Sequence, residues 1–277
     1  MRVFKNSVLI VLIIYLFAII IEQINNKIEA GTKFSILEQS NLKNKNNPRL
    51  ILYGSSHCDF GLSAKKITKI TKIKTINLCN YGIERKIYIK GFRNKLLSLL
   101  NENDIIIYSF RINTEKIPLE ESGILGFLLP QFRTTINYFI KSKIKKESSF
   151  DKYGDRIFYP KFNKTFNYPS YSIDYNEINS HIDRKINSIL SDKNFKSKVV
   201  VIITPLLIKN KSKINLQKIK FKCTNNCKNF LGLQKPLLIE DKKFFLLAEH
   251  LNPEMGRDFW TNSVINFLKK NVNFNNN

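Results

Sequence analysis

Histidine, cysteine and acidic residues are scarce in this chain of 277 residues. It has three histidines and four cysteines, and 22 acidic residues stand against 46 basic ones, which gives a formal net charge of +24. The histidines His57, His181 and His250 are scattered along the chain, which does not favour a metal site. Cys223 and Cys227 are closely spaced, but no second pair with metal-ligand spacing accompanies them. We therefore expect neither a metal nor another cofactor.

The excess of positive charge does not indicate a nucleic-acid-binding protein. Lysines are scattered through every segment alongside Asn and Ile, and the sequence has no nucleic-acid-binding signature and no basic helix. The charge does permit attraction to an anionic surface, such as lipid headgroups or phosphate-bearing glycans. We expect partners of that kind and no nucleic acid.

The N-terminus lacks the small-residue cleavage motif of a secretory signal peptide. Arg2 and Lys5 precede an uncharged apolar run from Val8 to Ile21, and the residues at the end of that run are large or charged. The run is shorter than the ~20 residues of a usual span, unless Lys5 extends its side chain to the headgroups. We interpret residues 1–24 as an uncleaved, single-pass membrane anchor, with the rest of the chain outside the cytoplasm.

Composition divides the remainder of the chain. Residues 25–48 are rich in Asn and Lys and end at Pro48, which is typical of a linker. One main domain is expected over residues 49–277, with insertions at about 114–171 and 209–240 that do not fit its repeat of strands and helices.

Short β-rich runs alternate with helical ones along the main domain. The expected strands are Arg49–Gly54, Ile73–Cys79, Asp104–Phe110 and Lys198–Leu206. Before the last of these, apolar residues at helical spacing predict a helix with one buried face, formed by Ile178, Ile182, Ile186 and Ile189. Continuous apolar strands that alternate with helices favour a parallel sheet covered on both faces. The predicted fold class is α/β, as a three-layer α/β/α sandwich.

Polar residues follow the first expected strand and precede the last expected helix. In a parallel α/β sheet, chemistry collects at the C-terminal ends of the strands. The first strand ends at Gly54 and is followed by Ser55, Ser56 and His57. His250 stands in a loop just before the last helix, whose expected N-cap is Asn252. From the residues alone, Ser56 and His250 are either catalytic or an ordinary turn serine and loop histidine, and His57 is expected to pack in the turn.

Two of the four cysteines are close enough in the sequence to form a disulfide loop. Cys223 and Cys227 flank an Asn-Asn pair that favours a turn, so they suit a small disulfide loop if the domain lies outside the cytoplasm. The spacing does not establish it.

Three short motifs follow the expected strands, and a fourth precedes the last expected helix. They are Gly54-x-Ser56 after the first strand, Gly82 after the second, Asn113 after the third, and His250-Leu-Asn-x-x-x-Gly256 before the last helix. This set resembles the SGNH, or GDSL-type, hydrolase superfamily, whose sheet is flavodoxin-like. It is most similar to the membrane-anchored branch that acts on cell-envelope polymers, in which Gly-Ser-Ser-His is a frequent first block. The resemblance covers residues 50 to 268, interrupted by the two insertions.

The resemblance implies a catalytic role for each motif. Ser56 would be the nucleophile and His250 the general base. The N–H groups of Ser56 and Gly82 and the side chain of Asn113 would form the oxyanion hole. A serine at a tight strand-to-helix turn is also chemically suited to project its hydroxyl outward.

The chain departs from the family at the acid of the triad. Relatives carry Asp three residues before the catalytic histidine, where this chain has Leu247. Glu249 is adjacent to His250 and poorly placed to reach its ring. Asp59 and Asp241 are the candidates for a substitute acid.

Two classes of function remain. The first is a membrane-anchored serine esterase or O-acyltransferase that acts on an acylated cell-envelope glycan, or a similar polymer, through an acyl-enzyme on Ser56. The second is a catalytically silent domain of the same fold, which binds glycan or supports a membrane acyltransferase partner. The sequence leaves the choice between hydrolysis and transfer open.

Overall fold

The computed structural model describes residues 13, 31–42, 47–80, 94–112, 150–157, 174–211, 214–246 and 250–272. The chain divides into two units, Met1–Gly31 with Lys116–Ser148 and Thr32–Glu115 with Ser149–Asn277. Only Ile13 and Gly31 of the first unit are described, so the fold below is that of the second. Apart from Ile13, the predicted anchor lies outside the described residues. Within the described ranges, no helix has the length and apolar character that crossing a membrane requires.

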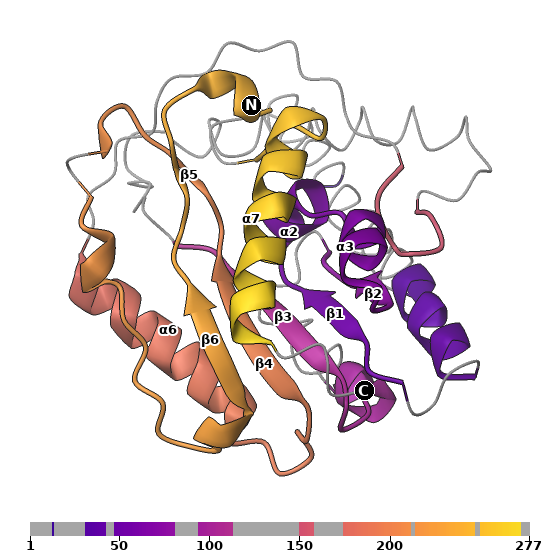
Figure 1. Ribbon diagram of the computed structural model, residues 1–277. Coiled ribbons are helices and arrows are strands. Elements are labelled where there is room, and N and C mark those ends of the chain that lie inside the picture. Colours follow the sequence, from indigo (N-terminus) through magenta and orange to yellow (C-terminus); the bar gives the residue numbers. More distant parts are fainter. Residues whose placement is uncertain are drawn as a thin grey trace, which may run out of the picture. The chain divides into compact units, whose positions relative to one another are not determined.

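A five-stranded sheet forms the centre of the second unit, with the strand order β2-β1-β3-β4-β6 (Figure 1). The strands are β1 Leu50–Tyr53, β2 Thr75–Asn77, β3 Ile105–Phe110, β4 Lys198–Ile203 and β6 Phe230–Gln234. Every neighbouring pair in this sheet is parallel, which confirms the predicted α/β class. Because β2 lies on one side of β1 and the later strands lie on the other, the topological switch point falls between β1 and β3.

Helices cover the two faces of the sheet. α3 (Ala64–Thr71) and α7 (Met255–Asn271) pack on one face, and Figure 1 shows α7 lying across the front of the sheet. The core on this face contains Leu50, Leu52, Ile105, Ile107, Val200, Ile202, Trp260, Val264 and Leu268. The ring of Phe110, on the opposite face of β3, lies 5.2 Å from that of His181 in α6 (Tyr175–Leu190). The arrangement is consistent with the predicted three-layer sandwich.

The fifth strand lies in a segment that was expected to be an insertion, residues 209–240. β6 pairs with β4 as a parallel edge strand, with one shift of register along the pair. Its sequence, FLGLQ, has no β-branched residue and contains Gly232, so the local signal for a strand is weak. The same segment supplies β7 (Leu238–Ile239), which pairs with β5 (Leu206–Leu207) in a small second sheet. Much of the expected insertion is therefore part of the fold.

Part of the expected linker also belongs to this unit. Residues 31–42 are helical. Lys33, Phe34, Leu37 and Ser40 are buried, at the spacing of one helix face. The amphipathic pattern is short and is flanked in the sequence by many Asn and Lys residues, so it does not predict a helix. Residues 32–42 of the expected linker therefore pack as part of the second unit.

The helices α6 and α7 each differ in one detail from the helices expected from the sequence. In α6 the fourth buried residue is Leu190, since Ile189 is half-buried. α7 begins at Met255, and the side chain of Asn252 caps the turn before it by accepting a hydrogen bond from the N–H of Glu254 at 2.8 Å. The prediction that Asn252 is the N-cap was therefore wrong, because Glu254 holds that position and the helix starts two residues later.

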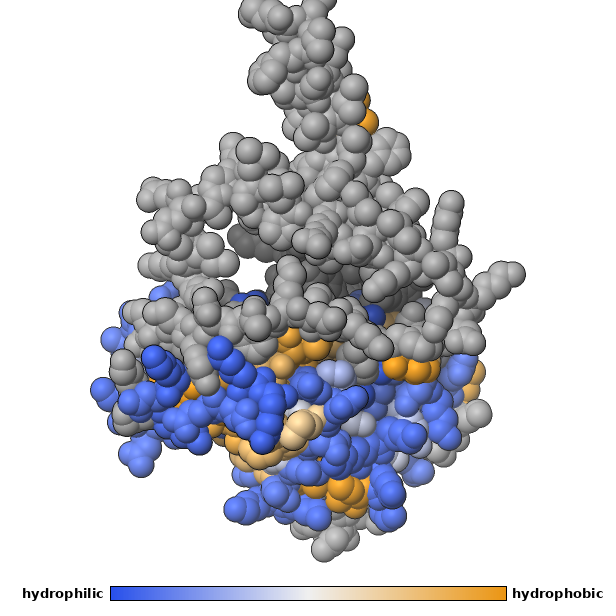
Figure 2. All heavy atoms as spheres, turned by 90° about the horizontal axis from the view of Figure 1, so that it is seen from above, coloured by the Kyte–Doolittle hydropathy of each residue, from blue (hydrophilic) through white to orange (hydrophobic). Residues whose placement is uncertain are grey.

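The surface is mostly polar in the view of Figure 2. Hydrophilic residues predominate among the described ones there, and hydrophobic residues form smaller patches between them.

Candidate active site

β1 ends in a tight turn that carries the candidate nucleophile. A Cβ atom added to Gly54 would lie 2.8 Å from Cβ and 2.9 Å from the carbonyl oxygen of Ser109 in β3, so a side chain does not fit at position 54. Ser55 is extended and forms the N-cap of α2 (Ser56–Gly61). Ser56 is therefore the first residue of a short helix, at the C-terminal edge of the sheet and at its switch point.

Ser56 and His250 meet at this edge. The Oγ atom of Ser56 lies 3.0 Å from Nε2 of His250, although the two residues are 194 positions apart. Ser56 is 7% exposed, and His250 is half-buried. A hydroxyl that donates to an imidazole nitrogen is the arrangement in which a histidine accepts the proton of an attacking serine. The structure thus brings together the two side chains that the sequence analysis assigned as nucleophile and base.

Close packing between α2 and the segment leading into α7 holds the pair in place. A Cβ atom on Gly61 would lie 2.6 Å from the ring of Trp260 and 3.1 Å from Leu251. The segment that carries His250 is tied back by an antiparallel bridge between Phe245 and Leu251. Such tight contacts leave little freedom to shift either element.

The ring of His250 lies against two further side chains of α2. The ring of His57 is stacked on it, with 4.3 Å between centroids and 21° between planes. The ring of Phe60 meets it edge-on at 5.5 Å and 83°. His57 is buried, and its Nδ1 atom lies 3.2 Å from Oγ of Ser55. The sequence analysis expected His57 only to pack in the turn and missed its contact with His250.

Asp59 is held in a buried ion network. Its Oδ1 atom lies 2.5 Å from Nζ of Lys33, and its Oδ2 atom accepts a hydrogen bond from Nε of Arg156 at 2.8 Å. Burial alone would raise the pKa of this carboxyl. The charges of Lys33 and Arg156, with the hydrogen bonds they donate, outweigh burial and hold the pKa of Asp59 below its usual value.

Asp241, the other candidate acid, lies in a half-exposed turn. Its side chain accepts a hydrogen bond from the N–H of Lys243 at 3.0 Å and lies 2.8 Å from Nζ of the same residue. These hydrogen bonds lower the pKa of Asp241. In the described part of the chain, neither Asp241 nor Asp59 bonds to His250. Leu247 and Glu249 lie outside the described residues.

A disulfide joins the candidate nucleophile helix to the neighbouring strand. Cys58 in α2 is bonded to Cys79, which follows β2. The N–H of Asn80 also donates to the carbonyl oxygen of Gly54 at 3.0 Å. The sequence analysis missed this disulfide. A signal was present, because Cys58 follows the first expected strand and Cys79 ends the second, and these strands are neighbours in the sheet.

The second disulfide is the one considered from the sequence. Cys223 and Cys227 are bonded, so no cysteine of the chain is free. The proposed oxyanion-hole residues Gly82 and Asn113 lie outside the described residues, so their role stays a prediction. In the part of the chain that is described, no group of three or more His, Cys, Asp or Glu residues has an arrangement that could hold a metal ion.

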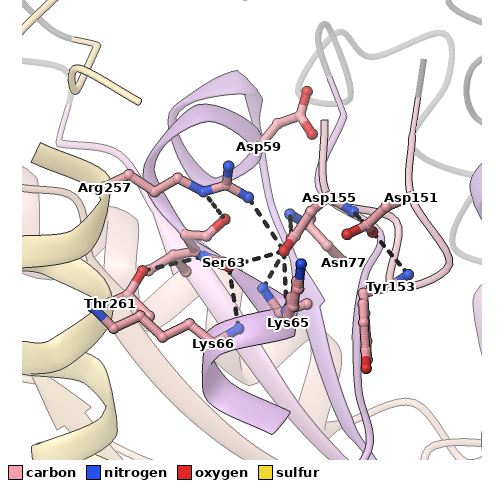
Figure 3. Close-up of polar contacts among 12 residues, drawn as sticks. Asp59, Ser63, Lys65, Lys66, Asn77, Asp151, Tyr153, Asp155, Arg257 and Thr261 are labelled. Carbon is pink, nitrogen blue, oxygen red and sulfur yellow. Dashed lines mark hydrogen bonds and ion pairs between the residues drawn. The ribbon is translucent and has the colours of Figure 1, made fainter. Parts of the chain in front are cut away.

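A buried carboxylate outside the Ser–His pair joins several elements (Figure 3). Asp155 accepts hydrogen bonds from the hydroxyl of Ser63, the first two N–H groups of α3 and Nδ2 of Asn77, at 2.9 to 3.1 Å. Arg257 of α7 lies 3.2 Å from the same carboxylate and donates to the carbonyl oxygen of Leu62 at 3.1 Å. Asp155 therefore fixes the start of α7, which follows the candidate base.

Fold and site together define an α/β protein with a parallel sheet and a serine–histidine pair at its switch point. Comparison with models of known protein families, with curated proteins and with solved structures found no match. The functional argument therefore rests on the geometry of this site and on the sequence motifs.

Proposed function

We propose that this chain is a membrane-anchored serine esterase or O-acyltransferase of the SGNH type, which acts on an acylated cell-envelope glycan. The observation that carries the proposal is the 3.0 Å contact between Ser56 Oγ and His250 Nε2 at the switch point of the sheet. The motifs around both residues and the flavodoxin-like strand order support the same assignment.

The chemistry follows from the two side chains. Oγ of Ser56 attacks the carbonyl carbon of the ester while Nε2 of His250 takes the hydroxyl proton. The tetrahedral intermediate collapses to an acyl-enzyme on Ser56, and the sugar hydroxyl leaves with the proton from His250. Water or an acceptor hydroxyl then attacks the acyl-enzyme, and His250 again removes the proton and returns it to Ser56. Water gives hydrolysis, and an acceptor hydroxyl gives acyl transfer.

The location proposed for the domain is outside the cytoplasm, behind the predicted anchor of residues 1–24. All four cysteines are in disulfides, which persist in oxidising compartments and are rare in the cytosol. The basic chain and the hydrophilic face in Figure 2 suit a polar or anionic envelope polymer.

Labelling with a fluorophosphonate tests the proposal directly. The full-length protein in mild detergent should take one label on Ser56, located by mass spectrometry of the tryptic peptides, and should hydrolyse a short-chain aryl ester. Ser56→Ala should lose both properties, since removing a triad nucleophile costs several orders of magnitude in rate. Ser188→Ala, on the exposed side of α6, is the matched control and should keep both. A folded wild-type chain that takes no label and hydrolyses no ester would refute the esterase and leave the silent, glycan-binding alternative.

A further inference from the structure

Three residues of a single short helix contact the imidazole of His250. Ser56 Oγ meets its Nε2 atom at 3.0 Å, the ring of His57 lies on its face at 4.3 Å, and the ring of Phe60 meets it edge-on at 5.5 Å. Ser56 and Phe60 are four positions apart, so both lie on the same side of α2. His57 lies between them in sequence and is buried.

These contacts restrict different motions of the ring. The stacked His57 ring fixes the plane of the imidazole, because tilting the imidazole would open the contact or drive the rings together. The hydrogen bond from Ser56 and the edge-on Phe60 fix its rotation within that plane. His57 is itself steadied by Ser55, whose Oγ atom lies 3.2 Å from Nδ1 of His57.

In a serine–histidine–aspartate triad the acid performs two tasks: it orients the imidazole and it stabilises the imidazolium. Asp59 is bonded to Lys33 and Arg156, and Asp241 to Lys243. The aromatic contacts of α2 act on the first of these tasks, because they bear on the orientation of the His250 ring.

We propose that His57, backed by Phe60, is a positioning residue for His250. The proposal rests on the proposed function, because the orientation of His250 affects turnover only if Ser56 is the nucleophile. Two features follow from it: the residue at position 57 must present a flat ring, and the ring needs no nitrogen to do so.

A matched pair of variants in the full-length protein tests this requirement. His57→Phe keeps a stacking ring, and His57→Leu fills the space without one. We expect His57→Phe to retain most of the kcat for a short-chain aryl ester. His57→Leu should lower kcat by about 10- to 100-fold with KM unchanged, the size of effect that misplaced catalytic groups produce. If His57→Leu does not fold, His57→Gln gives the same comparison, since it too lacks a ring.

A spectroscopic readout separates this proposal from the proposed function. The chain has three histidines, so with His181→Gln as background only the imidazole signals of His57 and His250 remain in a ¹⁵N spectrum. At constant pH, the His250 signal should be the same in the His57→Phe variant as with His57. In His57→Leu it should move toward the average of the two tautomers, because the Ser56 bond loosens.

The results of these experiments distinguish failure of the esterase proposal from failure of the positioning proposal. No fluorophosphonate label on the wild type, with a His250 signal that still depends on a ring at position 57, would refute the esterase and support the positioning contact. Normal labelling and turnover in His57→Leu, with an unchanged His250 signal, would overturn the positioning role and leave the esterase intact. Equal losses of kcat in the Phe and Leu variants would also overturn it, because stacking would then not be the cause.

Discussion

Asp59→Asn removes a negative charge that lies between two cations, Lys33 and Arg156, beside the candidate site. The Lys33 side chain is fully buried and that of Arg156 is 12% exposed, and each bonds to one carboxylate oxygen of Asp59. The amide of Asn is nearly the same size as the carboxylate but carries no charge. Since it takes the charge of Asp59 away from the buried Lys33 ammonium, we expect a large loss of stability.

The magnitude follows from the burial of the pair. Breaking a buried ion pair by removing one partner costs about 3–5 kcal/mol, because the remaining charge stays desolvated. With a urea m-value of about 2–3 kcal/mol/M, the unfolding midpoint should fall by roughly 1–2 M. Asp241→Asn is the matched control, because Asp241 is half-exposed and its ion pair with Lys243 lies in solvent. We expect no measurable change of midpoint there.

The stability that Asp59 contributes should fall at acid pH. The pKa of Asp59 is lower in the folded protein than its usual value of 3.8, so the unfolded chain binds the proton more tightly. The stabilisation by Asp59 is therefore complete above the unfolded pKa and is lost as the pH falls through the folded value. Below pH 3.8 the wild type should approach the stability of Asp59→Asn, and the difference between them should be constant near neutrality.

The measurement uses the fluorescence of Trp260. It is the only tryptophan in the chain and is 1% exposed in α7, so its emission reports unfolding of the domain. Urea titrations of wild type, Asp59→Asn and Asp241→Asn in detergent at neutral and acid pH give the midpoints. An Asp59→Asn variant with the wild-type midpoint, or equal losses in the two variants, would refute the assignment of Asp59 to a buried ion network.

Two further predictions concern the disulfides and the carboxylate of Asp155. Replacing Cys58 and Cys79 by Ala should cost about 3 kcal/mol and replacing Cys223 and Cys227 about 2 kcal/mol, because the loops that they close differ in length, 21 against 4 residues. Equal urea midpoints for the two double variants would contradict that argument. Asp155→Ala should cost about 3–5 kcal/mol, since it removes a carboxylate partner of the half-buried Arg257 and the acceptor for the start of α3. A change below about 1 kcal/mol in the same titration would show that this cluster is not structural.

Local periodicity in the sequence was sufficient to predict four of the five strands in the main sheet and the helices α6 and α7, but not α3. Strands such as β3 and β4 are continuous apolar runs because they are buried on both faces, and α6 shows its buried face at helical spacing. β6 was missed because its residues have little strand propensity of their own, and pairing with β4 decides its structure. The helix over residues 31–42 was missed because only contact with the domain distinguishes its short apolar face from a polar linker.

At the candidate site, the sequence determined which residues are candidates for catalysis, and the tertiary structure decided what each of them touches. Gly54, Ser56 and His250 stand out locally, through a tight turn after a strand and a loop before a helix. The contact of Ser56 with His250, 194 positions away, depends on how α2 and α7 pack. The stack of His57 on His250 likewise joins segments that no local pattern relates. The spacing of apolar and polar residues along a segment predicts the conformation of that segment. The partner of a side chain depends instead on packing between segments that are distant in the sequence, which only the folded chain fixes.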